Sequence, residues 1–92
     1  MAAEEKSTTT VGSVGEVVTI TATPLKAGVY SVTIATQSDW VILSDFTEVK
    51  FATATIDASG LINPCTIDST TKNKVLLNSA TTGAATILAF GI

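Results

Sequence analysis

The sequence of 92 residues contains no histidine and no arginine, so its five basic residues are all lysines. Without histidine the chain lacks the usual general base of catalytic triads and the commonest metal ligand. Without arginine it lacks the best bidentate ligand for phosphate and carboxylate groups. Nucleic-acid binding also needs a clustered basic surface, whereas the net charge is −3. We therefore expect no nucleic-acid partner and no enzyme activity.

Charged residues are also scarce, at 14% of the chain against about 25% in typical globular domains. Apolar residues account for 46%, and 17 threonines and 8 serines supply most of the polar side chains. These uncharged, partly β-branched side chains favour strands over helices. A domain of this size buries only about 60 to 65% of its unfolded surface. Few charges and a small core together favour a homo-oligomer, or docking on a larger particle.

Cysteine occurs once, at Cys65, so no disulfide can form within the chain. No base or second cysteine accompanies Cys65, and we interpret it as a buried small side chain. Residues 1–6 are polar and acidic with no apolar signal region after them, which predicts synthesis in a cytoplasm without export. No run approaches the roughly 20 apolar residues of a membrane helix, so we expect no membrane partner.

Alternating apolar and polar residues predict strands along most of the chain. Val14 to Thr23 and Val29 to Thr36 both alternate, and the turn residues 24–28 between them predict a hairpin. In the second of these strands Tyr30, Val32 and Ile34 are expected to point inward. A short strand that is apolar on both faces follows at residues 40–43.

Two later stretches predict strands with irregularities. Residues 46–56 form the longest run, and its alternation slips, which indicates a β-bulge near Ala52 or a strand that leaves one sheet for another. Residues 57–60 are a turn, and residues 61–67 read as an edge strand because Pro64 cannot donate a ladder hydrogen bond. Residues 68–73 form a polar loop.

The last nineteen residues, 74–92 (KVLLNSATTGAATILAFGI), predict a closing hairpin around a Ser-Ala-Thr-Thr-Gly turn. In its second strand the side chains are apolar on both faces, since successive side chains of a strand point to opposite faces of the sheet. Such a strand is either central in a sandwich or covered by another copy of the chain. Tryptophan is favoured at interfaces as well as in cores. The candidate interface residues are therefore Trp40, Ile87, Ala89 and Ile92.

About seven strands at intervals of roughly 8–12 residues, with no helical stretch, predict an all-β fold. We expect a small antiparallel β-sandwich or a jelly-roll-like barrel. Residues 1–13 have no periodicity and are expected to form a flexible or extended N-terminal arm. Residues 14–92 are expected to form a single β domain.

Two groups of oxygen-bearing side chains have the residue types of an active site or a metal site. Acids near aromatic residues can hydrolyse glycosidic bonds, and Asx residues can ligate calcium. Both groups lie where strand ends and turns favour such residues, and the second lacks EF-hand spacing. We therefore predict no catalytic residue, no cofactor and no metal. The groups are Asp39, Asp45 and Glu48, and Asp57, Asn63, Asp68 and Asn73.

The segment Asn78-Ser-Ala-Thr-Thr-Gly83, followed by apolar residues to Phe90-Gly91-Ile92, resembles small β-rich capsid decoration and accessory virion proteins of tailed phages. The low-charge composition and the polar N-terminal stretch are similar too. The resemblance implies a β-rich body, self-association and an N-terminal arm laid on a capsid lattice, and it carries no site residue over to this chain.

These observations predict a non-enzymatic structural or assembly protein that forms a homo-oligomer and docks on a capsid or another protein lattice. Its location is the virion if the resemblance holds, and otherwise the cytoplasm. The alternative is a small binding module for a carbohydrate or another surface ligand, with Trp40 as its exposed aromatic residue.

Overall fold

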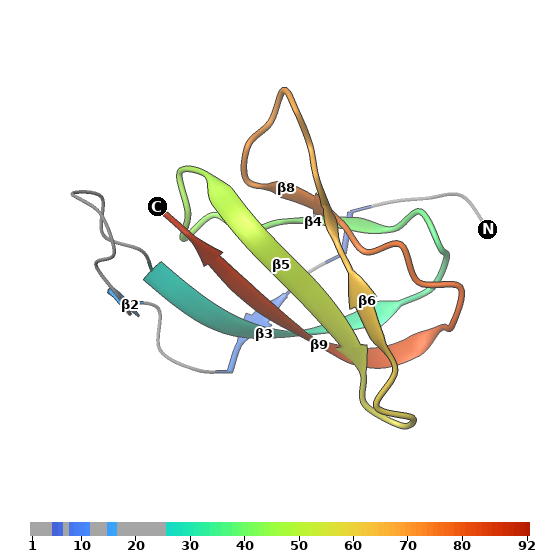
Figure 1. Ribbon diagram of the computed structural model, residues 1–92. Coiled ribbons are helices and arrows are strands. Elements are labelled where there is room, and N and C mark those ends of the chain that lie inside the picture. Colours follow the sequence, from blue (N-terminus) through green and yellow to red (C-terminus); the bar gives the residue numbers. More distant parts are fainter. Residues whose placement is uncertain (1–4, 7, 12–14, 17–25) are drawn as a thin grey trace.

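The computed structural model describes residues 5–6, 8–11, 15–16 and 26–92, and all regular structure in these residues is β-strand (Figure 1). Two antiparallel sheets account for the nine strands found there, so the predicted all-β class is confirmed. Within the same residues no helix has the length and apolar character needed to cross a membrane. The predicted strand from Val14 to Thr23 lies outside the described residues, apart from Gly15 and Glu16.

The larger sheet is organised around its central strand, β9. Strand β9 pairs with β3 along its whole length, from Gly83 opposite Ile34 to Gly91 opposite Lys26, and it pairs with β5 on its other side. The strands lie side by side in the order β1 (Thr9–Thr10), β3 (Lys26–Ile34), β9 (Gly83–Gly91), β5 (Val49–Ile56) and β6 (Ile62–Pro64), and β2 (Gly15–Glu16) also pairs with β3.

The smaller sheet covers one face of the larger sheet. It contains β4 (Trp40–Ile42), β8 (Lys74–Leu76) and β7 (Thr66–Ile67), with β8 in the middle. The two layers pack into a small β-sandwich, which is one of the two predicted architectures.

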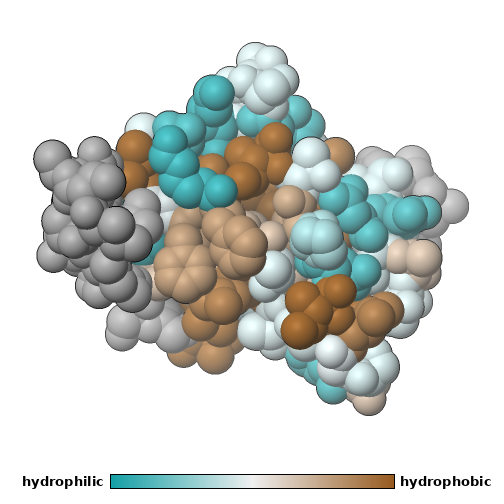
Figure 2. All heavy atoms as spheres, in the orientation of Figure 1, coloured by the Kyte–Doolittle hydropathy of each residue, from teal (hydrophilic) through white to brown (hydrophobic). Residues whose placement is uncertain are grey.

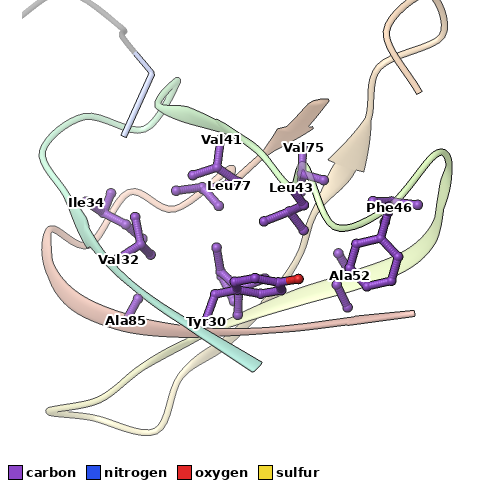
Figure 3. Close-up of a cluster of buried hydrophobic side chains, with 14 of the residues drawn as sticks. Tyr30, Val32, Ile34, Val41, Leu43, Phe46, Ala52, Val75, Leu77 and Ala85 are labelled. Atoms are coloured by element: carbon purple, nitrogen blue, oxygen red, sulfur yellow. The ribbon is translucent and has the colours of Figure 1, made fainter. Parts of the chain in front are cut away.

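A single hydrophobic core fills the space between the two sheets, with side chains directed inward from both layers (Figure 3). On β3 the predicted alternation is confirmed, because Tyr30, Val32 and Ile34 are buried and Ser31 and Thr33 are exposed. The smaller sheet and its flanking residues contribute Val41, Leu43, Val75 and Leu77, and the larger sheet also contributes Ala52, Ala54, Ile56, Ala85, Ile87 and Ala89.

The predicted closing hairpin at residues 74–92 is wrong. Strand β8 pairs with β4 and β7, whereas β9 pairs with β3 and β5, so the two runs belong to different sheets. Both runs face the same core from opposite sides: Val75 and Leu77 cover it from the smaller sheet, and Ile87 covers it from β9. Asn78, with φ of 56°, lies where the chain leaves the smaller sheet for the larger one.

Two predicted irregularities are present in this part of the chain. The register of β5 against β9 shifts between Val49 and Phe51, so a β-bulge is confirmed, with Lys50 rather than Ala52 as the extra residue. The predicted edge strand at residues 61–67 is split. Its first part, β6, is an edge of the larger sheet, and its second part, β7, is an edge of the smaller one, so this segment crosses between the layers at Cys65.

Candidate functional site

The outer face of the larger sheet carries one charged side chain on strands β3, β9, β5 and β6, that of Lys50 at the bulge near the start of β5. Residues that alternate with the core positions point away from the smaller sheet. An antiparallel sheet face that is left in water usually carries polar and charged residues. The outward residues are Ala27, Val29, Ser31 and Thr33 on β3, Ala84, Thr86, Leu88 and Phe90 on β9, Lys50, Phe51, Thr53 and Thr55 on β5, and Ile62 and Pro64 on β6.

One half of this outer face is apolar, and we call Val29, Phe51, Leu88 and Phe90 the apolar patch. Phe51 lies opposite Phe90, and their ring centroids are 6.1 Å apart at an interplanar angle of 44°. Leu88 lies between Val29 and Thr53 in the sheet register. Phe51 is 52% exposed and Leu88 is 38% exposed, and Figure 2 shows apolar surface across this face of the larger sheet.

Ile62, which is 61% exposed, lies further along the same face, at its β6 edge. Leu61, which is 50% exposed, precedes it in the turn and lies beside the inward-facing Ile56, so it does not belong to this face. Ile62 lies opposite Thr55, and Pro64 lies opposite Thr53, so β6 adds apolar surface beside the hydroxyl groups of β5. The uncharged surface therefore continues from the apolar patch to the edge of the sheet.

The other half of the outer face carries hydroxyl groups. Ser31 and Thr33 on β3 and Thr86 on β9 lie there, and the Thr86 hydroxyl donates to the Asp57 carboxylate at 2.8 Å. A shallow hollow of about 240 Å³ is lined by Thr9, Ser31, Val32, Thr33, Asp57, Ala84 and Ala85. The hollow offers hydroxyl groups and one carboxylate, which form hydrogen bonds but do not make a catalytic pair.

The four predicted interface residues do not lie together. Ile87 and Ala89 are 0% exposed and belong to the core, so the predicted interface is corrected at these two positions. Ile87 faces inward because it lies opposite the inward-facing Tyr30 in the register of β3 and β9. Trp40 and Ile92 are partly exposed at separate places, and the Trp40 ring carries the Lys74 ammonium group 4.2 Å from its centroid.

The residues that reach the surface on β9 are instead Leu88 and Phe90. The sequence does not distinguish them from the core positions of the strand, because the side chains on both faces of β9 are apolar. The inner face of β9 can be inferred from β3, on which Tyr30, Val32 and Ile34 alternate with polar residues, because a strand paired with β3 must share its inner face.

The carboxylates near Trp40 serve the fold rather than a shared site. Asp39 is 0% exposed and accepts hydrogen bonds from the Ala35 amide at 2.7 Å, the Thr36 amide at 2.9 Å and the Thr36 hydroxyl at 2.8 Å. The Lys6 ammonium group lies 4.0 Å from the same carboxylate. Asp45 accepts a hydrogen bond of 2.9 Å from the Tyr30 hydroxyl. Burial, and then this hydrogen bond, raise the pKa of Tyr30 above its ordinary value.

Of the residues weighed as calcium ligands, Asp57, Asp68 and Asn73 have other partners, whereas the buried side-chain nitrogen of Asn63 has no hydrogen-bond partner in the described part of the chain. Asp68 accepts hydrogen bonds from the Thr70 and Thr71 amides, chiefly that of Thr71, and these lower the pKa of its carboxyl group. The Asn73 amide donates to the Phe46 carbonyl at 3.3 Å. Among the residues that the structure describes, no three His, Cys, Asp or Glu side chains are grouped so that they could hold a metal ion.

Cys65 is half-buried, and its thiol lies 4.0 Å from the Asn63 carbonyl oxygen. Burial raises the pKa of the Cys65 thiol to about 11. At neutral pH the thiol is therefore protonated, whereas nucleophilic attack requires the thiolate.

The described part of the predicted N-terminal arm pairs with the body of its own chain. Glu5 forms an isolated parallel bridge with Trp40, and the Lys6 amide donates to the Trp40 carbonyl at 2.8 Å. Thr9 and Thr10 pair with β3 at the edge of the larger sheet. These residues therefore contact edges of both sheets, β4 in the smaller and β3 in the larger.

Comparison of the chain with protein-family models, with curated proteins and with solved structures finds no match. We therefore infer the function of the chain from its own surface and contacts.

Proposed function

We propose that this chain is a non-enzymatic assembly protein, a subunit whose outer sheet face is covered by other protein in its working state. The observation that carries the proposal is the outer face with its exposed apolar patch, on which Lys50 at the bulge is the one charged residue of β3, β9, β5 and β6. Burial of apolar surface contributes about 25 cal/mol per Å², so covering one side chain such as Phe51 or Leu88 is favourable by roughly 1 to 2 kcal/mol. This stabilisation is obtained only when the side chains are removed from water, as they would be under a protein partner.

The same proposal gives the chain a place in a virion, as a capsid decoration or accessory subunit located on a protein lattice. Low charge supports it, because a subunit surrounded by neighbours needs fewer solvated side chains than a free monomer. We assign self-association to the sheet face rather than to the arm, because the described residues of the arm already pair with β3 and β4. Nucleic acid and membranes are not among the proposed partners.

A carbohydrate-binding module is not favoured by any contact. Sugar recognition uses an open aromatic face with polar side chains around it. The Trp40 ring has the Lys74 ammonium group over it, and the exposed Phe51 and Phe90 rings have apolar neighbours. We therefore propose only the assembly role.

The proposal is tested by the molar mass of the full chain in solution, measured by light scattering and sedimentation equilibrium over a range of concentrations. A closed oligomer that forms at micromolar concentration or below is the expected result. A chain that remains monomeric at every concentration, and that also fails to co-sediment with purified capsid shells, would contradict it.

A further inference from the structure

We propose that the apolar patch is the contact between two copies of this chain, which pack their larger sheets face to face about a two-fold axis. The proposal rests on the assembly role and names its partner. In such an isologous contact the same surface is used by both subunits. The apolar patch of one copy then covers the apolar patch of the other.

The chemistry of the outer face suits a second copy because the face is compatible with itself. Of the outward residues on β3, β9, β5 and β6 only Lys50, at the bulge near one end of the face, is charged, and it is paired with Glu48, so two identical faces meet with little like-charge repulsion. The hydroxyl groups of Ser31, Thr33 and Thr86 are both donors and acceptors, and they can therefore pair with the same groups of another copy. A face lined with carboxylates or ammonium groups could not pair with itself in this way.

The division of the face into two halves determines the direction of the axis. A two-fold axis that runs along the strands places the apolar patch on the apolar patch of the other copy. It places the other half, which carries the hydroxyl groups and also Ile62 and Pro64 of β6, on the same half of the other copy. An axis across the strands would place Phe51 and Leu88 against Ser31 and Thr86, which buries hydroxyl groups against apolar surface. We therefore assign the first orientation, with the strands of the two copies within about 30° of each other, as in aligned sheet packing.

The size of the face is close to what a specific contact needs. Strands lie about 4.8 Å apart and rise about 3.4 Å per residue, so β3, β9, β5 and β6, with 9, 9, 8 and 3 residues, give a projected area of about 470 Å². The accessible area of a pleated face covered with side chains exceeds its projection. It therefore approaches the roughly 600 to 800 Å² per partner of small specific interfaces.

Charged groups lie at the ends of the face. Lys50 forms an ion pair of 3.1 Å with Glu48 beside the bulge, and Lys26 donates to the Asp45 carbonyl at 3.4 Å. Asp57 lies at the opposite end, next to Thr86. These groups stay in water at the rim when the two faces pack together, which is the usual arrangement of an interface.

The test is the substitution Leu88→Lys, measured by sedimentation equilibrium on the full chain. Leu88 is already 38% exposed in one chain, so lysine can be placed there without entering the core. In the dimer two ammonium groups would be buried near each other, and we expect the dissociation constant to rise by at least about tenfold. Thr71→Lys is the matched control, because it adds the same charge on the exposed loop between β7 and β8.

The mixing experiment tests the two-fold geometry itself. Leu88→Glu is expected to dissociate as Leu88→Lys does, and an equal mixture of the two variants is expected to form heterodimers, because opposite charges then meet across the axis. Failure of the mixture to associate would overturn the isologous arrangement. Far-ultraviolet circular dichroism and thermal unfolding verify that the variants keep the fold. Phe51→Thr is the second variant, and because it adds no charge it should weaken the dimer less than Leu88→Lys does.

The outcomes separate this inference from the assembly role. A wild-type oligomer whose mass is unchanged by Leu88→Lys would overturn the proposed contact and leave the assembly role intact. A wild-type monomer that co-sediments with capsid shells would exclude the second copy as the occupant of the patch while supporting the assembly role. A monomer that binds neither would overturn both.

Discussion

Asp39 organises the corner at which the chain passes from the larger sheet to the smaller one. Its carboxylate accepts three hydrogen bonds from Ala35 and Thr36, and its backbone carbonyl accepts a bond of 3.0 Å from the Leu77 amide. Lys6 brings the N-terminal segment to the same carboxylate. One fully buried acid therefore connects the turn after β3, the end of the smaller sheet and the beginning of the chain.

Asp39→Ala is expected to lower the free energy of unfolding by about 2 to 4 kcal/mol, because it removes all three accepted hydrogen bonds and the counter-charge of Lys6. Urea denaturation followed by tryptophan fluorescence measures the change. Asp57→Ala is the control: Asp57 is exposed and its carboxylate accepts a hydrogen bond from the Thr86 hydroxyl, so its loss should cost less than about 1 kcal/mol. Equal effects of the two substitutions would contradict the role assigned to Asp39.

At the bulge, strands β5 and β9 leave no room for a side chain at Gly91. Gly91 lies opposite Val49, and a Cβ atom added at Gly91 would overlap the Glu48 carbonyl oxygen and lie 2.9 Å from the Val49 Cα atom. The Ile92 amide donates to the Glu48 carbonyl at 2.9 Å, and the Ile92 carbonyl accepts from the Thr47 and Glu48 amides. The bulge therefore joins the end of β9 tightly to the start of β5.

Gly91→Ala should destabilise the chain by about 2 kcal/mol or more, because the clash is with backbone atoms that are held by hydrogen bonds. Gly28→Ala is the comparison. Its added Cβ atom would meet the end of the Tyr30 side chain, 2.7 Å from the hydroxyl oxygen, and a side chain can move more easily than a paired strand. Thermal and urea unfolding of both variants give the order, and a larger loss for Gly28→Ala would refute this interpretation.

Across the described part of the molecule, most of the large apolar residues left after the core is filled, namely Phe51, Ile62 and Leu88, lie on the outer face of the larger sheet. The exposed large apolar residues of the described chain are Val11, Phe51, Leu61, Ile62 and Leu88, and all but Val11 lie on β9, β5, β6 or the turn before β6. The charged residues described on the larger sheet lie at its ends and edges. This separation makes the outer face a surface on which apolar contact, and not charge pairing, would determine association.

Self-association through this face is therefore expected to resist salt. Between about 0.05 and about 0.5 M sodium chloride the dissociation constant should stay within about threefold or decrease, because salt screens the repulsion between two chains of net charge −3 and does not weaken apolar contact. Sedimentation equilibrium at several salt concentrations measures this. Dissociation at high salt would instead indicate an interface held by ion pairs.

Local alternation was enough to predict the class of the fold and much of its inner face. Tyr30, Val32 and Ile34 alternate with hydroxyl residues, and the slip of parity in residues 46–56 indicated the bulge. The turn at residues 57–60 and the edge position of Pro64 follow from the backbone chemistry of glycine and proline. These features depend on residues that are near each other in the sequence, so one strand at a time suffices to predict them.

The partners of β8 and β9, and the exposed face of β9, were decided by tertiary structure alone. Their sequences suit a hairpin, but the core needs Val75 and Leu77 on one side and Ala85, Ile87 and Ala89 on the other, which separates the two runs into different sheets. Because both parities of β9 are apolar, only its register with Tyr30 on β3 places Ile87 inside and Leu88 outside. Alternation along a strand divides its side chains into two sets that point to opposite faces of the sheet. Where both sets are apolar, only pairing with a neighbouring strand determines which set is buried.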